Sequence, residues 1–202
     1  FKTYMWVSND FGATFRSVNA NLSTEVVKTL TEDTKNADVL YIGTETGLFA
    51  SLDRGKSWRR IKGNLPTVRI DEITIHPRDN AMILATHGRS IWILDHLEPI
   101  QEFAATQASA SDATLFSIGP ALQWRSKDHQ NDEFWGHHFF AGENPPTDAV
   151  IQFHLKKPVG ALSLKITDAL GKDVRTIAIP AARNRAANAC GVSRSGSGVG
   201  VS

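Results

Sequence analysis

Two copies of one eight-residue motif decide the fold of this chain. They read Ser8-Asn9-Asp10-Phe11-Gly12-Ala13-Thr14-Phe15 and Ser51-Leu52-Asp53-Arg54-Gly55-Lys56-Ser57-Trp58. Both follow the pattern Ser-x-Asp-x-Gly-x-x-aromatic, and their two aspartates lie 43 positions apart. A complete motif that recurs at such a distance indicates an internal structural repeat.

Each residue type in the motif suits a tight reversal between two strands. The aspartate carboxylate and the serine hydroxyl can accept hydrogen bonds from turn amides that would otherwise lack a partner. The glycine permits a positive φ, and the aromatic residue begins the return strand and can cover the hairpin. We therefore predict a structural role for the motif rather than a catalytic one. With a third repeat described below, the predicted structural residues are Ser8, Asp10, Gly12, Phe15, Ser51, Asp53, Gly55, Trp58 and Asp95.

A third, degenerate repeat is marked by Ile91-Trp92-Ile93-Leu94-Asp95, whose aspartate lies 42 positions after Asp53. Residues 41–49 and 84–92 also match, each as an apolar strand, a turn with Thr and Gly, and a second apolar strand. A period of about 40–45 residues with four short strands is typical of β-propeller blades. The sequence therefore predicts an all-β chain. A partial β-propeller of about two and a half four-stranded blades fills residues 1–103, and an incomplete β-sandwich follows.

Alternating apolar residues and turn signals place the strands of this propeller. The aspartate motif joins the third and fourth strands of a blade, so it lies on one rim. The second-to-third and fourth-to-first connections lie on the opposite rim, where we expect the functional loops at 44–46, 62–65 and 86–89. The expected strands are 25–30, 39–44, 48–52 and 58–61 in one blade, and 69–76, 82–86 and 90–94 in the next.

The two motifs resemble the Asp boxes, or bacterial neuraminidase repeats, of a propeller family. That family includes sialidases, xyloglucan-cleaving hydrolases and the luminal ten-bladed domain of sortilin. The phrase at residues 85–95 is similar to the one that ends the last blade in bacterial proteins labelled sortilin-like or "glycosyl hydrolase". The resemblance covers about residues 1–103 and implies the architecture. It does not imply an activity, because the same blade serves enzymes and binding proteins.

The composition changes after the repeats. Residues 104–113 are small and polar, so we expect a linker. In residues 114–180, two alternating strands at 150–155 and 162–166 are expected, and a hairpin turn at 168–172 leads to a return strand at 174–179. Its phrase Leu164–Thr176 resembles the Ig-like domain of the flagellar hook-capping protein, which implies a partial Ig-like β-sandwich.

The last segment, 181–202, is built mainly from Ala, Gly, Ser, Asn and Arg. It cannot bury enough apolar surface to offset its ordering entropy, so we expect a low-complexity, disordered tail. The single cysteine, Cys190, excludes an internal disulfide.

Composition excludes several classes of function. The 202 residues carry 22 basic and 21 acidic side chains, a net charge of +1, which gives no electrostatic footprint for nucleic acid or anionic membranes. No apolar run approaches the roughly 18 residues of a spanning helix. Adjacent histidines such as His137-His138 point to opposite faces of a strand and poorly chelate one metal. The aromatic residues around them are expected to plug the junction between propeller and sandwich. We expect no cofactor and no metal.

The resemblance to sialidases does not extend to a visible active site. Those enzymes share an arginine triad, a Tyr–Glu nucleophile pair and an acid Asp. This chain has only Tyr4 and Tyr41, both expected in strands. Asp71 and Glu72 lie near the start of an inner strand and are the best carboxylates for a xyloglucanase-like role, but a solvated loop pair is the more ordinary interpretation. No catalytic residue is assigned.

Three residues in the expected functional loops are ligand-binding candidates: Glu45, His87 and Arg89. The resemblance implies a non-catalytic binding or scaffold module of a secreted or periplasmic propeller protein, which recognises a protein or a glycan. The alternative is part of a glycoside hydrolase whose catalytic residues lie mostly outside this chain. Two and a half blades do not close a ring, so we expect a fragment whose partners include the remaining blades of the parent chain.

Overall fold

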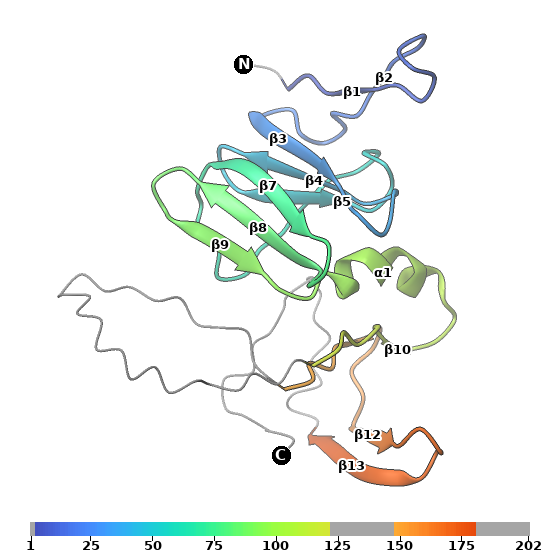
Figure 1. The fold of residues 1–202 in the computed structure, drawn as a ribbon. Helices are drawn as coiled ribbons and strands as arrows, with labels where there is room; N and C mark the ends of the chain where they lie inside the picture. The colour runs from blue at the N-terminus through green and yellow to red at the C-terminus, as the bar shows by residue number, and fades with distance from the viewer. Residues whose placement is uncertain (1–2, 122–147, 181–202) are drawn as a thin grey trace, which may run out of the picture.

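The computed structural model describes residues 3–121 and 148–180 (Figure 1). The expected disordered tail at 181–202 and the aromatic segment around His137 lie outside the described residues. Within them the chain is all-β apart from one helix: a partial propeller is followed by an incomplete sandwich, as the sequence predicts.

Three sheets correspond to the repeats, and we call them the first, second and third blades. The second has four antiparallel strands in the order β3-β4-β5-β6, whereas the third has three, β7-β8-β9, and the first has two, β1-β2. The predicted strands of the second and third blades are confirmed to within three residues at each end. The bounds are β1 Trp6–Val7, β2 Arg16–Ser17, β3 Val27–Glu32, β4 Leu40–Thr44, β5 Leu48–Ser51, β6 Arg59–Arg60, β7 Ile70–His76, β8 Ala81–Thr86 and β9 Ile91–Leu94.

The second blade is apolar on both faces because alternate residues of its strands point to opposite sides. On β4, Tyr41 joins the core shared with the third blade, and its neighbour Ile42 joins the core shared with the first. Each blade is therefore held by burial against its neighbours. The core between the second and third blades contains Val39, Tyr41, Leu48, Ala50, Ile70, Ile73, Ile75, Met82 and Leu84, and the core between the first and second contains Met5, Val18, Leu22, Ile42, Phe49 and Trp58.

The second and third blades approach most closely at Gly43. A Cβ atom at this position would lie 2.8 Å from both Cγ2 and the carbonyl oxygen of Ile70, and 2.8 Å from Cγ2 of Thr29. Real Cβ atoms do not occupy such positions, so this step of β4 has room only for glycine. A hydrogen bond of 3.0 Å from the Thr31 hydroxyl to the Ile73 carbonyl also joins β3 to β7.

After β9 the chain does not form a linker but enters helix α1, Glu98–Ala108. The linker predicted at 104–113 is therefore wrong for residues 104–108, which form the second half of this helix. The helix forms for a local and a tertiary reason. Pro99 suits the first helical turn, and Leu97 and Ile100 are buried in the core between the second and third blades. Figure 1 shows α1 at the ends of β3 and β7.

A buried polar network fastens α1 to both blades. The Gln101 side-chain amide donates hydrogen bonds to Oδ2 of Asp33 at 2.9 Å and to Oδ1 of Asn80 at 2.9 Å, and it accepts one from Asn80 at 3.0 Å. The Tyr41 hydroxyl also donates to Asp33, at 2.9 Å. Asp33 belongs to the second blade and Asn80 to the third. Gln101 thus links the two blades through groups that would be costly to bury without partners.

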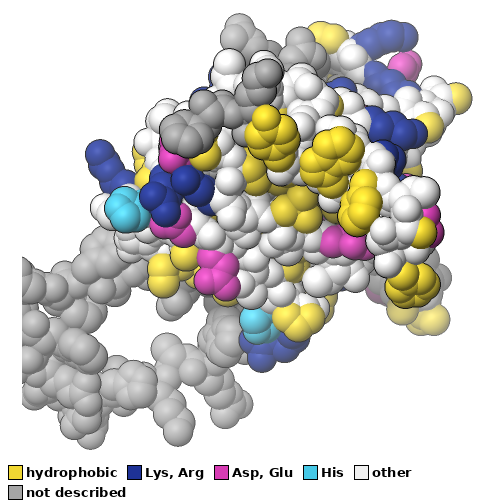
Figure 2. Space-filling model, turned by 90° about the horizontal axis from the view of Figure 1, so that it is seen from above, with side chains coloured by type: hydrophobic (Ala, Val, Ile, Leu, Met, Phe, Trp, Pro, Cys, Tyr) yellow, Lys and Arg dark blue, Asp and Glu magenta, His cyan; other side chains and the backbone are white. Residues whose placement is uncertain are grey.

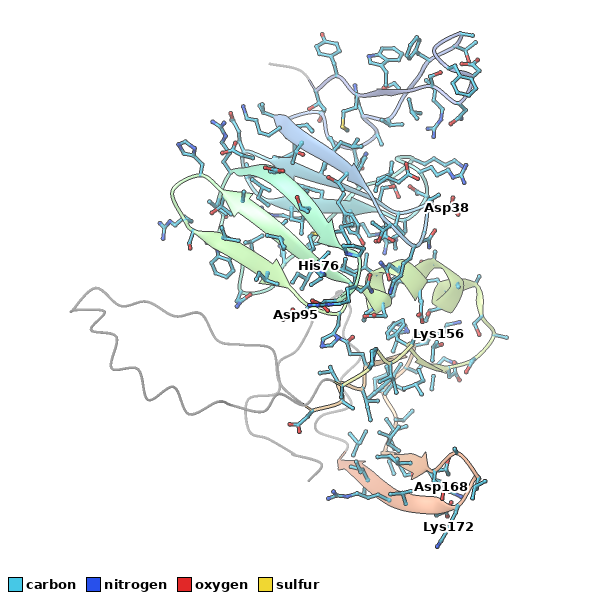
Figure 3. The ribbon with its side chains drawn as sticks, in the orientation of Figure 1. Asp38, His76, Asp95, Lys156, Asp168 and Lys172 are labelled. Atoms are coloured by element: carbon cyan, nitrogen blue, oxygen red, sulfur yellow. The ribbon has the colours of Figure 1, made fainter. Side chains whose placement is uncertain are left out.

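The remaining described residues form two small antiparallel sheets. Strand β10, Ala113–Leu115, pairs with β11, Phe153–Leu155, and this sheet packs on α1 through Phe103 and His154, whose rings lie edge to face at 5.3 Å. Strands β12, Ala161–Thr167, and β13, Asp173–Pro180, form the predicted hairpin. The Asp168 carboxylate accepts hydrogen bonds from the amides of Leu170 and Lys172 in its turn, which Figure 3 labels at Asp168 and Lys172.

Substitution of Gly43 tests the packing of the blades. We expect Gly43→Ala to lower the free energy of unfolding by about 1–3 kcal/mol, because the new methyl group would overlap the backbone of Ile70. The matched control is Gly63→Ala, whose Cβ would meet no atom within 4 Å and should cost nothing or stabilise slightly. Equal effects of the two substitutions in urea denaturation would contradict the close approach.

Candidate functional site

The turns of the blades define two rims. One rim, which we call the lower rim, holds the turns that join β3 to β4 (33–39) and β7 to β8 (77–80). It also holds the Asp box of the second blade and helix α1. Figure 3 shows Asp38, His76 and Asp95 on this side, near α1. The upper rim holds the loops 45–47, 61–69 and 87–90. The Asp boxes therefore lie opposite the loops that carry the ligand-binding candidates.

The two Asp boxes have the same hydrogen-bond pattern. In the second box, Oδ1 of Asp53 accepts bonds from the Ser51 hydroxyl at 2.7 Å and the Ser57 amide at 2.9 Å, and Oδ2 accepts one from the Ser57 hydroxyl at 2.6 Å. The Ser51 hydroxyl oxygen accepts a bond from the Gly55 amide at 2.8 Å. In the first box, Asp10 accepts the corresponding bonds from Ser8 and Thr14. Both carboxylates are occupied by their own turn.

The glycines of the two boxes have similar backbone conformations, but the aromatic residues differ in exposure. Gly12 and Gly55 have φ values of +93° and +79°, a region that favours glycine. Trp58 is 3% exposed, and its indole N–H donates to the Val18 carbonyl at 2.8 Å. Phe15 is 62% exposed, so it does not provide the apolar cover expected of it.

The third box is absent from the third blade. Strand pairing sets Ser51 opposite Leu40 and Leu94 opposite Met82, so the residue equivalent to Asp53 is His96 and not Asp95. The 87–90 loop has four residues where the 45–47 loop has three, and this extra residue shifts the register. Within the described residues Asp95 accepts no hydrogen bond, and the chain continues into α1 instead of a fourth strand. The prediction of Asp95 as a box residue is wrong.

The hydrogen bonds of the boxes stabilise ionised carboxylates. Bonds from Thr14 and Ser8 lower the pKa of Asp10 from its usual 3.8 to about 2. At Asp53, burial opposes ionisation, but the bonds from Ser57 and Ser51 outweigh it and the pKa also lies below its usual value. A carboxyl group that is ionised and saturated in this way is unsuited to act as a general acid.

On the upper rim, Glu45 lies in the turn between β4 and β5. Thr44 holds this turn, because its hydroxyl oxygen accepts bonds from the amides of Thr46 and Gly47, each at 3.1 Å. The Glu45 carboxylate forms an ion pair of 3.0 Å with Lys28 on β3 and is about half exposed. Glu45 is thus held in place and still open to solvent.

His87 and Arg89 lie in the turn between β8 and β9. Nδ1 of His87 is 3.5 Å from Asp71, which also accepts a hydrogen bond of 2.5 Å from Arg69. The bond from Arg69, with smaller help from His87, lowers the pKa of Asp71. These contacts favour the ionised form of Asp71. Within the described residues, the Arg89 guanidinium forms no ion pair.

The structure adds residues that sequence reasoning missed. Lys28 pairs with the candidate Glu45, and Arg69 pairs with Asp71. On the same rim, Arg60 donates a hydrogen bond of 2.5 Å to the Thr46 carbonyl. The signal for these pairs lies in strand pairing, since Lys28 and Glu45 are adjacent to the paired residues Val27 and Thr44. Among the described residues, no group of three His, Cys, Asp or Glu side chains could hold a metal ion.

Comparison with known proteins identifies the family. The family Sortilin-Vps10, described as sortilin, neurotensin receptor 3, matches residues 3–131 of the chain. The chain belongs to the Sortilin-Vps10 family. The match spans all three blades and α1, which agrees with the partial propeller described above. No curated protein and no solved structure matched the chain.

Membership of the Sortilin-Vps10 family has two consequences. The family supports a propeller that serves as a binding or scaffold module, and its members are typically extracellular or luminal. In the described part of the chain, no helix is both long and apolar enough to cross a membrane.

The Asp box of the second blade makes stability depend on pH. We expect Asp53→Ala to cost about 0.5–2 kcal/mol at pH 7, comparable to the loss of a helix cap. Because the folded-state pKa of Asp53 is depressed, its contribution is present above the unfolded pKa near 4 and is lost as pH falls through the lower folded value. Thermal unfolding of the parent chain and of Asp53→Ala between pH 7 and pH 2 measures this pH dependence. A difference in melting temperature that persisted unchanged at pH 2 would contradict the assignment.

Proposed function

We propose that this chain is a non-catalytic binding module of a secreted propeller protein, and that its upper rim recognises a protein or peptide. One observation carries the proposal: the upper rim, which no Asp box and no helix of the described residues occupies, presents charged side chains that are fixed yet exposed. The ion pair of Lys28 with Glu45 and the contacts of Asp71 with Arg69 and His87 provide this arrangement.

A protein ligand is favoured over a glycan by the family. The family description names a neurotensin receptor, and propellers of this family suggest protein binding. Charged groups of both signs across a surface suit the recognition of a partner of complementary charge. We assign the contacts to Glu45, His87 and Arg89.

The alternative, part of a glycoside hydrolase, has less support in this chain. A retaining or inverting glycosidase needs one carboxyl group that holds a proton at working pH. Asp71 does not, since Arg69 depresses its pKa. Glu45 is engaged in an ion pair of 3.0 Å with Lys28.

The remaining blades of a larger propeller are a second proposed partner. Ile91 and Ile93 on β9 are 66% and 61% exposed, whereas their equivalents on β5, Leu48 and Ala50, are buried against the third blade. The outer face of the third blade thus has the chemistry of a face that another blade covers. Figure 2 shows hydrophobic side chains at the surface on the opposite side. The large hydrophobic residues exposed between positions 3 and 30 are Tyr4, Trp6, Phe11, Phe15 and Leu30.

Selection of peptides tests the binding function. A phage-displayed random peptide library is selected on the full chain, and the affinities of enriched peptides are measured by calorimetry. We expect Arg89→Gln and Glu45→Gln to weaken binding about tenfold, on the scale of a lost charge-assisted contact. The matched control is Arg78→Gln on the lower rim, where Arg78 pairs with Asp79.

Two outcomes would contradict this function. One is a set of peptides whose affinity falls with Arg78→Gln and not with Arg89→Gln. The other is hydrolysis of xyloglucan oligosaccharides or of a fluorogenic sialoside by the purified chain at a rate that Asp71→Asn abolishes, which would establish the hydrolase instead.

Self-association tests the open face of the third blade. Exposed apolar sheet faces promote association, so we expect the Ile91→Ser, Ile93→Ser double variant to remain monomeric at concentrations where the parent chain associates. Leu170→Ser is the control, since Leu170 is 94% exposed in the β12–β13 turn. Sedimentation velocity measures the difference, and equal association of both variants and parent would exclude this face as the cause.

A further inference from the structure

The third blade lacks the fourth strand that completes the second blade. In the second blade β6 pairs with β5, whereas among the described residues no strand lies beyond β9, the outermost strand of its sheet in Figure 1. The residues that follow β9 enter α1, and the hydrogen bonds of Gln101 hold them there. These residues are therefore not available to complete the third blade, and the outer edge of β9 is open.

The open edge of β9 presents the backbone groups of Ile91 and Ile93. In the second blade, the Leu48 carbonyl accepts a hydrogen bond of 2.9 Å from the Ile61 amide, at the end of β6. Because alternate residues of a strand direct their backbone groups to opposite edges, Leu48 and Ala50 both face β6. Strand pairing makes Ile91 and Ile93 their equivalents. The amides and carbonyls of these two isoleucines therefore point to the edge where a fourth strand would lie.

In the second blade, an asparagine of the preceding loop receives the first residue of the fourth strand. The Asn21 side chain accepts a hydrogen bond of 2.9 Å from the Trp58 amide and donates one of 2.8 Å to the Trp58 carbonyl. The indole N–H of Trp58 donates to the Val18 carbonyl, and its ring joins a core that contains Leu22 and Phe49. The start of the strand is thus bound through the backbone and through the ring of one aromatic residue.

An equivalent loop precedes the third blade. Residues 18–26 and 61–69 have equal length, and Asn64 and Leu65 occupy the places of Asn21 and Leu22. Equivalent backbone hydrogen bonds hold the ends of both loops: from Val18 to Met5 and from Ile61 to Leu48 at one end, and from Glu45 to Val26 and from His87 to Arg69 at the other. The Asn64 side chain is exposed and forms no hydrogen bond within the described residues. Asn64 therefore has the position of a side chain that receives a strand, but no strand to receive.

The apolar residues beside Asn64 are also incompletely covered. In the junction of the first and second blades, the three apolar residues that surround Trp58 are at most 9% exposed. Their equivalents Ile61, Leu65 and Trp92 pack against the core between the second and third blades but remain partly exposed. The ring that β6 supplies to one junction has no counterpart from a fourth strand in the described part of the other.

We propose that the edge of β9 binds an extended segment of a partner protein, which adds to the third blade as an antiparallel fourth strand. The segment begins with an aromatic residue, whose backbone bonds to Asn64 and whose ring covers the apolar residues beside it. The residues that follow form backbone hydrogen bonds with Ile91 and Ile93. In strand addition of this kind, main-chain bonds supply affinity and the contact of one side chain supplies specificity. This edge is separate from the upper rim of the proposed function, so either can exist without the other.

NMR titration of the full chain with a peptide that copies β6 tests this assignment. The probe is Ac-Ser-Trp-Arg-Arg-Ile-NH2, the sequence of residues 57–61, and the matched peptide Ac-Ser-Ala-Arg-Arg-Ile-NH2 has the same charge. We expect the probe to bind about tenfold more tightly, since burial of an aromatic ring contributes on that scale. The probe should also slow hydrogen exchange of the Ile91 and Ile93 amides, and should change little at Trp92 and Leu94, whose amides face β8.

Two pairs of variants separate the contacts of the strand. Asn64→Ala should weaken the probe about tenfold, because two hydrogen bonds are lost. Its control is Asn9→Ala, since Asn9 is an exposed asparagine of the first blade. Ile93→Pro removes an amide that faces the open edge, a position where proline is tolerated in a strand, and should abolish binding. Ile93→Ser keeps this amide and should bind as the parent does.

Several results would overturn the proposal. Equal binding of the two peptides would exclude recognition of the aromatic residue, and equal binding by the parent, Asn64→Ala and Ile93→Pro would exclude the edge. Protection of the Ile93 amide before any peptide is added would show that the edge is already filled. Such protection would belong to another segment of the same chain if it were independent of concentration, and to a second copy if it grew with concentration. Asn64→Ala keeps the test valid if Ile93→Pro unfolds the blade, which its melting temperature would reveal.

Discussion

The structure depends on one constraint: a blade of short strands has two apolar faces, and both must be covered. The second blade meets it on both faces, with Tyr41 turned to one neighbour and Ile42 to the other. Gly43 is required because two backbones meet there, and α1 is fastened across the same junction through Gln101, Leu97 and Ile100.

The hydrogen bonds that hold the turns differ between the two rims. On the lower rim, the carboxylate and serine hydroxyl of the box satisfy the amides of its own turn. The upper turns are satisfied differently, through the Thr44 hydroxyl, and their charged side chains remain directed to solvent. The residues that hold the box turns are therefore not the ones proposed to contact a ligand.

Much of this architecture could be predicted from the sequence, since strands and box turns depend on local pattern. Alternation placed β3 to β9 closely, and the glycine positions anticipated the positive φ at Gly12 and Gly55. Helix α1 could not be found this way, because its small residues resemble a linker and the decisive contacts, from Gln101 to Asp33 and Asn80, join distant parts of the chain. The prediction that Asp95 is a box aspartate was wrong because one extra residue in the 87–90 loop changed the register, which only strand pairing reveals.

Sequence reasoning predicted the rim on which the candidate residues lie, but not the network of contacts around them. Glu45, His87 and Arg89 lie on the upper rim, yet the partners that fix the carboxylates there, Lys28 and Arg69, lie on neighbouring strands or just before them. Such pairs depend on side-chain reach across a sheet, and a repeat pattern carries no information about it.

The network around Gln101 also bears on how such a protein can change by duplication. The hydrogen bonds of the Asp and Ser side chains in a box turn are complete within one repeat, so a copied repeat keeps them. Gln101 instead bonds to Asp33 in one blade and to Asn80 in the next, and thus recognises a junction between two particular repeats. A blade inserted between these two would separate Gln101 from Asp33 or from Asn80 and would break the hydrogen bonds that cross this junction. The junction of the second and third blades is therefore a part of the array that duplication cannot interrupt freely.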